Sequence, residues 1–273
     1  MMDFRSALDQ ICGADGALSD EQKRHFDEQG YVILPNVFSP EQCRRFAAEF
    51  DRLSAIEGAE GGKEVHTEAG APRVSNVFNK TDVFDVCLRS GPILHAAYHL
   101  LGDLKLHGAN MRNPLKGQGH QNLHSDAPKE SQRDWRVANA LIPFDDMDRT
   151  NGATRVVPGS HLWPALTSPD SPVTMQLTEA EQSMLPKDRA ARHPRQIEVE
   201  LRAGDVVVIN GALWHGGTLN ESGRNRRMLH LSFTRRDLPQ QLVQQDYLTP
   251  GFQQRLTPAL HYLLDTHPLS SAA

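Results

Sequence analysis

The feature that most constrains the fold is a series of short apolar segments between residues 104 and 235, several of which alternate apolar and polar side chains. An alternation of period two places successive side chains on opposite faces of a β-strand. In the last segment, Leu229 and Leu231 share one face, and Met228 and His230 share the other, which we assign to the interior. Because glycine, proline and aspartate separate the segments, the series predicts a β-sandwich or barrel. The predicted strands lie in LKLHGANM, WRVANALIPF, ATRVVPGSH, IEVELRAGD, VVVING and RMLHLSFTRR.

The region before these strands carries helix signals. Ser19 and Ser39 are each followed three residues later by glutamine, the pattern of a capping box, and Pro40 suits the first turn of the second helix. Between these two helices, YVILP reads as a short strand. Residues 82–101 also have a helical pattern, whereas the glycine-rich residues 57–73 predict a loop that could act as a lid.

One long insertion interrupts the strands, from about residue 163 to about residue 196. Long insertions in compact folds are often functional, so we expect this one to form a wall over the site. The 273 residues suit a single domain with helices at the N-terminus and a tail over 237–273.

Composition argues against several classes of protein. The formal net charge of −5 gives no basic footprint for nucleic acid or for a membrane surface. No apolar run approaches bilayer length, and the first residues lack the apolar core of a secretory signal. The three cysteines are widely spaced and form neither a disulfide framework nor a zinc pattern. We therefore expect a cytoplasmic protein that has neither nucleic acid nor a membrane as a partner. We also expect a monomer or homodimer.

Two histidines and one aspartate are the strongest functional signal. His124 and Asp126 are separated by one residue, so on a strand both side chains point the same way and can bind one ion. His215, about ninety residues later, can complete the set from another strand. Two imidazoles and one carboxylate with open positions form the facial triad typical of non-heme Fe(II) oxygenases. We predict that His124, Asp126 and His215 bind iron and form the catalytic centre.

Two other pairs in the sequence also consist of a histidine and an acidic residue that are separated by one residue. His25 and Asp27 lie in a predicted helix, where residues i and i+2 do not share a face, so we interpret this pair as structural. His66 and Glu68 lie in a polar, glycine-rich stretch, which predicts a loop. Only His124 is preceded by a glycine-rich loop and followed by strands and a further histidine.

The order of these motifs resembles that of the phytanoyl-coenzyme A dioxygenase family of Fe(II)/2-oxoglutarate oxygenases. The resemblance covers roughly residues 20–236 and rests on FDEQGYVILPNVFSPEQ, QNLHSD, TNGATRVVPGSH, RAGDVVVINGALWHGG and the arginine-rich turn before RMLHLSF. It implies a mainly β fold with flanking helices, the double-stranded β-helix or jelly-roll barrel of cupin-like proteins. It also implies Fe(II), 2-oxoglutarate as cosubstrate and O2, with hydroxylation of an unactivated C–H bond of a small-molecule substrate and release of succinate and CO2.

The resemblance also implies residues that bind the cosubstrate. The family's cosubstrate arginine maps onto Arg226, whose guanidinium can hold a carboxylate through two parallel hydrogen bonds. Many family members carry a hydroxyl at the position of Gly217, so Thr218 is the nearest substitute here. We interpret Arg224 and Arg227 as surface charge. Further candidates for contact with the cosubstrate are Asn110, His107 and Gln121.

The sequence does not specify the substrate. Arg112, Trp135 and Asn139 are candidate substrate-binding residues, and cationic side chains near the metal strand hint at an acidic small molecule, although ordinary loop charges explain them equally well. Asp126 favours hydroxylation over halogenation, because related halogenases replace this carboxylate by a small residue. Desaturation and epimerisation stay open. So do two other classes, a cupin-type metal enzyme that does not use 2-oxoglutarate and a non-catalytic ligand-binding barrel.

Overall fold

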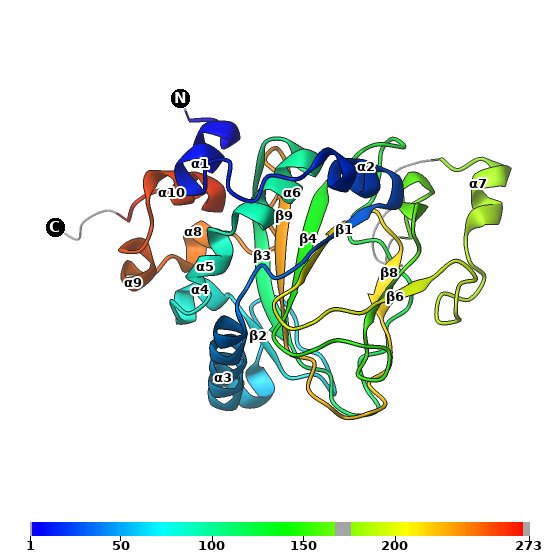
Figure 1. The fold of residues 1–273 in the computed structure, drawn as a ribbon, viewed down its shortest axis with the longest axis horizontal. Helices are drawn as coiled ribbons and strands as arrows, with labels where there is room; N and C mark the ends of the chain where they lie inside the picture. Colours follow the sequence, from blue (N-terminus) through cyan, green and yellow to red (C-terminus); the bar gives the residue numbers. More distant parts are fainter. Residues whose placement is uncertain (1, 167–175, 270–273) are drawn as a thin grey trace.

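The computed structural model describes residues 2–166 and 176–269. Within these residues the strands form two antiparallel sheets, one of six strands in the order β1-β7-β4-β9-β3-β2 and one of three in the order β6-β5-β8. Figure 1 shows the smaller sheet facing the larger one, with most helices on the far side of the larger sheet. The strands are β1 Tyr31–Leu34, β2 Arg73–Ser75, β3 Leu104–Arg112, β4 Val137–Pro143, β5 Thr154–Val156, β6 Ile197–Val199, β7 Val206–Asn210, β8 His215–Gly217 and β9 Met228–Arg235.

The prediction of a mainly β protein with flanking helices is confirmed. Each predicted strand segment contains a strand of the structure, from β1 in YVILP to β9 in RMLHLSFTRR. β2 and β8 have three residues each and lie outside the predicted segments.

Helix starts agree with the predicted caps. α2 (Asp20–Gln29) and α3 (Pro40–Glu57) begin after Ser19 and Ser39, and both capping boxes are formed. The predicted helix over 82–101 is divided into α5 (Asp85–Leu88) and α6 (Gly91–Leu101), with Pro92 in the first turn of α6, where its missing N–H is tolerated. The other helices are α1 Phe4–Ile11, α4 Val77–Lys80, η1 Gly58–Glu60, η2 Ser160–Leu162, α7 Glu179–Met184, α8 Gln244–Tyr247, α9 Pro250–Gln253 and α10 Pro258–Leu264.

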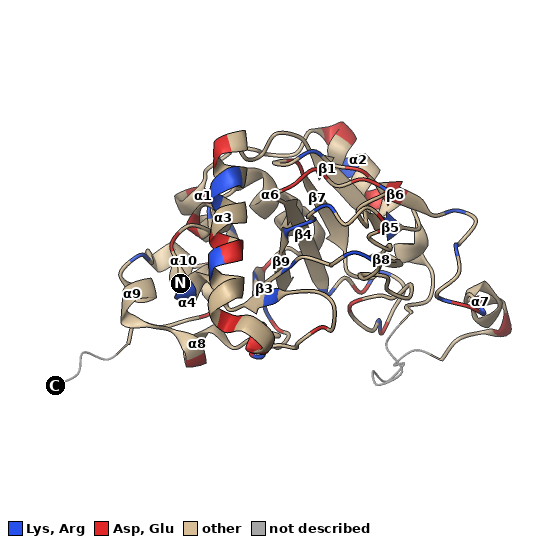
Figure 2. Ribbon diagram, turned by 90° about the horizontal axis from the view of Figure 1, so that it is seen from below, with Lys and Arg blue, Asp and Glu red and all other residues tan. Residues whose placement is uncertain are grey.

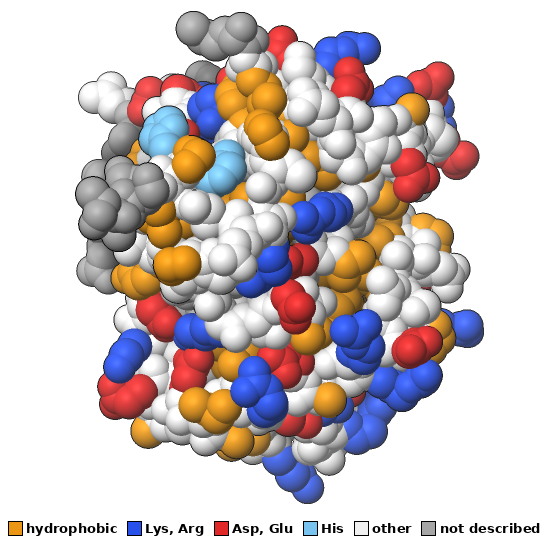
Figure 3. All heavy atoms as spheres, turned by 90° about the vertical axis from the view of Figure 1, so that its left-hand side faces the viewer, with side chains coloured by type: hydrophobic (Ala, Val, Ile, Leu, Met, Phe, Trp, Pro, Cys, Tyr) orange, Lys and Arg blue, Asp and Glu red, His pale blue; other side chains and the backbone are white. Residues whose placement is uncertain are grey.

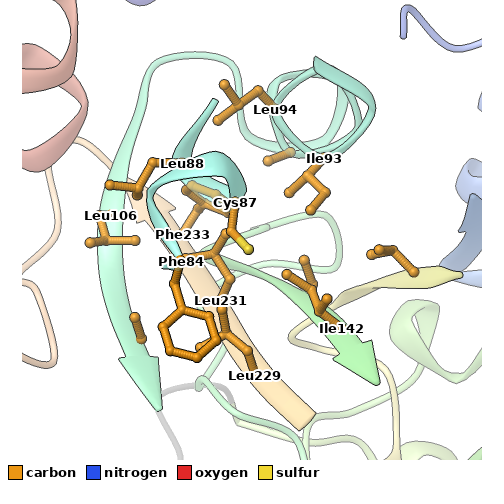
Figure 4. Close-up of a cluster of buried hydrophobic side chains, with 14 of the residues drawn as sticks. Phe84, Cys87, Leu88, Ile93, Leu94, Leu106, Ile142, Leu229, Leu231 and Phe233 are labelled. Carbon is orange, nitrogen blue, oxygen red and sulfur yellow. The ribbon is translucent and has the colours of Figure 1, made fainter. Parts of the chain in front are cut away.

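A large apolar core lies between the helices and the outer face of the six-stranded sheet. Phe84 and Ile93, from the region of α5 and α6, lie over Leu231 and Phe233 of β9 (Figure 4), and all four are fully buried. Burying such apolar area stabilises the fold by roughly 25 cal/mol per Å². The outer face of β9 therefore packs against the helices, and its other face is turned toward the smaller sheet.

A second apolar cluster lies between the two sheets. Leu141, Val207 and Met228 of the larger sheet pack there with Val156 and Val199 of the smaller one. Met228 was predicted on the inward face of β9 and is found there, because alternate residues of a strand point to opposite faces. Polar residues on the same inward faces are thereby held inside the roll.

The outer surface carries charges of both signs. Figure 2 shows basic and acidic residues along α3. On the face viewed in Figure 3, basic and acidic side chains lie among small apolar patches. No helix within residues 2–166 and 176–269 combines the length and the apolar character needed to cross a membrane.

The aromatic cluster around α3 gives a test of the outer core. Phe46 is 1% exposed, with its ring 5.4 Å from Phe38, 5.3 Å from Phe84 and 5.4 Å from Phe144. We expect Phe46→Ala to lower the free energy of unfolding by about 3–5 kcal/mol, because it leaves a cavity among buried rings. Ile56→Ala on the same helix is the control, since Ile56 is 69% exposed. Chemical denaturation measures both, and equal small losses would contradict this packing.

Candidate metal centre

A cavity of about 220 Å³ lies between the two sheets. Its walls include Asn110 of β3, His230 of β9, Thr154 of β5 and His215 of β8, together with His124 from the loop before β4. The lining is mainly polar, in contrast to the apolar cluster between the sheets. The three residues predicted to bind iron all line this cavity.

Backbone pairing brings the two histidines together. The N–H of His124 donates to the carbonyl of His215 at 2.9 Å, and the N–H of His215 donates to the carbonyl of His124 at 3.0 Å. The N–H of Asp126 donates to the carbonyl of Gly211 at 2.7 Å. The segment carrying His124 and Asp126 therefore runs beside β8 and the turn before it, so that residues far apart in the sequence point into one cavity.

Each histidine is oriented by a carbonyl two residues before it. Nδ1 of His124 lies 2.8 Å from the carbonyl of Asn122, and Nδ1 of His215 lies 2.8 Å from that of Leu213. In a neutral ring these bonds place the proton on Nδ1 and leave the Nε2 lone pair free, as in metal-binding histidines. Nε2 of His124 lies 3.6 Å from Oδ1 of Asp126, and Nε2 of His215 lies 3.3 Å from Oδ2.

The electrostatics of this trio suit a divalent cation. Burial alone would raise the pKa of Asp126, but His215 and His124 hold that pKa well below its usual range. Burial and the nearby His215 lower the pKa of His124, whereas Asp126 outweighs burial and raises the pKa of His215. One ligand atom from each residue lies within 4.8 Å of the others. Two imidazoles with free Nε2 atoms and an ionised carboxylate fit Fe(II), with positions left open toward the cavity.

Arg226 presents an unpaired guanidinium to the same cavity. Its side chain is buried, with 1% of the residue exposed, and among the described residues Nε and Nη2 have no hydrogen-bond partner. Burial, and then the nearby Arg112, lower the pKa of Arg226. A buried cation without acceptors is costly unless a ligand supplies them. The site therefore fits an anion such as the far carboxylate of 2-oxoglutarate.

The neighbouring arginines lie outside the cavity, as predicted. Arg224 is exposed and pairs with Asp148 at 2.6 Å. Arg227 lies on the opposite face and pairs with Asp145 at 2.7 Å.

The other cosubstrate candidates divide into two groups. Asn110, His107 and Gln121 line the cavity. Nδ1 of His107 accepts a bond from the N–H of Gln241 at 3.0 Å, so the neutral ring presents an Nε2–H group. Burial lowers the pKa of His107, which favours this neutral form. The structure does not bring Thr218 to the cavity, because its hydroxyl donates to the carbonyl of Ala153 at 2.8 Å.

The three substrate candidates also lie in different places. Arg112 and Asn139 line the cavity, and the Asn139 amide donates to Oδ2 of Asp126, so this residue orients a predicted metal ligand. Trp135 does not line the cavity. Its ring lies 5.4 Å from that of His161 and 5.2 Å from Nζ of Lys129.

Some residues that line the cavity were missed in the sequence. The alternation of β9 placed His230 and Ser232 on the same face as Met228, but neither was predicted as a site residue, and both line the cavity. Arg73 lies on β2, which is outside the predicted strand segments. His66 was interpreted as a loop residue, and that loop reaches the cavity.

The expected wall over the site is not formed by the described part of the insertion. None of its described residues lines the cavity, and residues 167–175 lie outside the described residues. The insertion instead supports the metal segment from outside, since the N–H of Leu123 donates to the carbonyl of Arg189 and that of Ser125 to Leu166, both at 2.8 Å.

The bond from Asn139 to Asp126 gives a first test. Asn139→Ala should lower the affinity for Mn(II) about 10- to 100-fold, because groups that orient metal ligands have effects of this size. Asn122→Ala is the control, since its side chain is exposed and its carbonyl is retained. Titration of the metal-free protein measures both, and an unchanged affinity in Asn139→Ala would show that this bond does not orient the ligand.

Proton competition gives a second test. The pKa of His215 is raised above its ordinary value of 6.5 in the metal-free protein, whereas Asp126 stays ionised. Protons therefore occupy the site as the pH falls through the raised pKa of His215, and metal affinity should fall about ten-fold per pH unit below it. Mn(II) titrations between about pH 8 and about pH 6 measure this. An affinity independent of pH would count against imidazole ligands.

Comparison with known proteins gives a consistent result. A model of the phytanoyl-CoA dioxygenase (PhyH) family matches residues 26–228. The iron/alpha-ketoglutarate-dependent dioxygenase ausO of Aspergillus calidoustus is 28% identical over 229 residues, which cover 78% of this chain and 71% of ausO. An ectoine dioxygenase of Nocardia farcinica is 30% identical over 156 residues, covering 54% of this chain and 52% of that enzyme.

Solved structures share the fold. HygX from Streptomyces hygroscopicus, with nickel and 2-oxoglutarate bound, has a TM-score of 0.62 at 19% identity, covering 82% of this chain and 90% of HygX. The non-heme alpha ketoglutarate dependent carbocyclase SnoK from nogalamycin biosynthesis has a TM-score of 0.61 at 24% identity, covering 89% and 92%. The predicted double-stranded β-helix is thereby confirmed.

Proposed function

This chain belongs to the phytanoyl-CoA dioxygenase family of non-heme iron, 2-oxoglutarate-dependent dioxygenases, and we propose that it hydroxylates an unactivated C–H bond of a small molecule, with release of succinate and CO2. The observation that carries the proposal is the meeting of three ligand residues and an unpaired, buried arginine in one cavity. When bound, Fe(II) and 2-oxoglutarate supply the activation of O2 and the oxidising power, and the protein supplies position and a dry site.

His124, Asp126 and His215 would hold the metal. Their orientation is fixed before a metal arrives, because each imidazole is held through Nδ1 and the carboxylate accepts a bond from Asn139. Such preorganisation lowers the cost of binding and leaves the open positions directed into the cavity. HygX, which was crystallised with nickel and 2-oxoglutarate, supports a metal and the same cosubstrate in this fold.

Arg226 would hold the far carboxylate of 2-oxoglutarate. Its buried guanidinium offers two parallel N–H donors to a carboxylate. At the family's hydroxyl position, Gly217, a Cβ atom would lie 2.5 Å from the carbonyl oxygen of Gly119, so this backbone leaves no room for a side chain. Thr154 pairs directly with Gly217 across β5 and β8 and lines the cavity. We propose that the Thr154 hydroxyl takes the place of the missing one.

The family match favours an oxygenase over the two alternative classes, a cupin-type metal enzyme without 2-oxoglutarate and a non-catalytic barrel. Hydroxylation, desaturation and epimerisation differ in their products. Hydroxylation adds one oxygen atom to the substrate, desaturation removes two hydrogen atoms, and epimerisation leaves the mass unchanged. Mass spectrometry of the product therefore separates them once a substrate is found.

Anaerobic reconstitution tests the proposal. The protein with Fe(II) and 2-oxoglutarate should show a weak metal-to-ligand charge-transfer band in the visible spectrum. Asp126→Ala should lose the band and all 2-oxoglutarate-dependent succinate formation. Arg226→Ala should keep metal binding and weaken 2-oxoglutarate binding at least about 100-fold, because a buried charge-assisted pair is lost. Thr154→Val, which has nearly the same shape, should weaken it about ten-fold through one lost hydrogen bond.

Absence of the band in the wild-type protein, with metal bound, would overturn the proposal. An Arg226→Ala variant with unchanged 2-oxoglutarate affinity would contradict the assignment of the cosubstrate site alone. Thr218→Val is the matched control for Thr154→Val, since the Thr218 hydroxyl donates to a carbonyl outside the cavity.

A further inference from the structure

A second pair of arginines lies in the same cavity and is not used by the metal or by Arg226. Arg73 of β2 and Arg112 of β3 are directly opposite one another across the antiparallel pair, and both line the cavity. Their side chains are 7% and 3% exposed. Among the described residues, Nε of each has no hydrogen-bond partner. Both therefore keep donor capacity that the protein leaves unused.

These two arginines share one carboxylate. Glu68 accepts from Nη1 of Arg73 at 2.6 Å and from Nη2 of Arg112. Glu68 lies in the loop before β2 rather than on a strand, and its side chain is 23% exposed. Two buried cations are therefore paired with a single acid that reaches in from the surface, and one positive charge is left over. An incoming anion can add to this arrangement or replace Glu68.

The charges of the cavity do not balance when the proposed cofactors are bound. Three arginines line it, against the carboxylates of Asp126 and Glu68, which leaves one positive charge. The two charges of Fe(II) and the two of 2-oxoglutarate cancel. A surplus charge in a buried site is expensive unless a further anion is bound there.

We infer that Arg73 and Arg112 form a substrate subsite that binds an oxyanion, a carboxylate in the simplest case, and that the substrate is a small acid. The inference rests on the proposed function, because it takes Arg226 to be occupied by 2-oxoglutarate. Paired guanidinium groups match the planar, two-oxygen geometry of a carboxylate. The acid would be anchored at this subsite while the rest of the molecule extends along the cavity toward the metal.

The experiment uses the full chain loaded with Mn(II) and saturated with 2-oxoglutarate under argon. Acetate, butanoate and hexanoate are titrated calorimetrically, each paired with its primary amide, which has the same shape without the charge. We expect the acids to bind about ten-fold or more tightly than the amides, the difference expected for one charge-assisted contact. Equal binding of acids and amides, or no binding of any acid, would overturn the inference.

Three variants assign the subsite. Arg73→Gln and Arg112→Gln should each weaken acid binding about ten-fold, whereas Glu68→Gln should strengthen it several-fold, because a competing carboxylate is removed. Arg52→Gln is the control for charge, since Arg52 pairs with Glu49 on the exposed side of α3. Should the arginine variants fail to fold, Glu68→Gln alone tests the subsite, because a gain in affinity for the acids cannot come from misfolding.

Two further outcomes separate the proposals. If Arg112→Gln weakens 2-oxoglutarate binding and leaves acid binding unchanged, the pair belongs to the cosubstrate site and the inference is wrong. If the wild-type protein binds Mn(II) but not 2-oxoglutarate, the proposed function fails. Acid binding that is strengthened by Glu68→Gln would then still establish the anion subsite.

Discussion

Two backbone hydrogen bonds, exchanged between His124 and His215 at 2.9 and 3.0 Å, are the constraint on which the rest of the site depends. They fix the register of two segments about ninety residues apart. A slip of one residue would turn every side chain to the other face, and His124, Asp126 and His215 would no longer meet. The arrangement of the candidate metal ligands is therefore a consequence of strand pairing.

The two faces of the six-stranded sheet differ in polarity and in role. The outer face buries aromatic and aliphatic side chains against α3 and against α5 and α6 (Figure 4), and this packing stabilises the fold. The inner face carries polar and charged groups around the cavity, among them Asn110, Asn139, Arg226 and His230. Burying such groups is unfavourable in the empty protein, so the outer core must compensate for it. Among them, Arg226 favours an anionic ligand, because its guanidinium has already been removed from water during folding and keeps donors without a partner among the described residues.

Much of the fold and the centre of the site could be predicted from the sequence. The alternation in RMLHLSFTRR placed Met228 inside and Leu229 outside, and both are found there. The spacing of His124 and Asp126 indicated a shared ion, and the structure brings their ligand atoms together with His215. The residues at the cavity that were not predicted are placed there by contacts that no local sequence pattern encodes. Thr154 reaches the cavity through its register with Gly217, and Arg73 reaches it through the pairing of β2 with β3. The loop of His66 and Glu68 has no periodicity, so its position at the cavity follows from tertiary packing alone.

The most direct test of the central claim is anomalous diffraction from crystals of the protein grown with Mn(II) or Fe(II) and 2-oxoglutarate. We predict one strong peak within coordination distance of Nε2 of His124, Nε2 of His215 and a carboxylate oxygen of Asp126, with 2-oxoglutarate extending from that peak to Arg226. A metal peak elsewhere, or a metal bound by only one of the two histidines, would contradict the account.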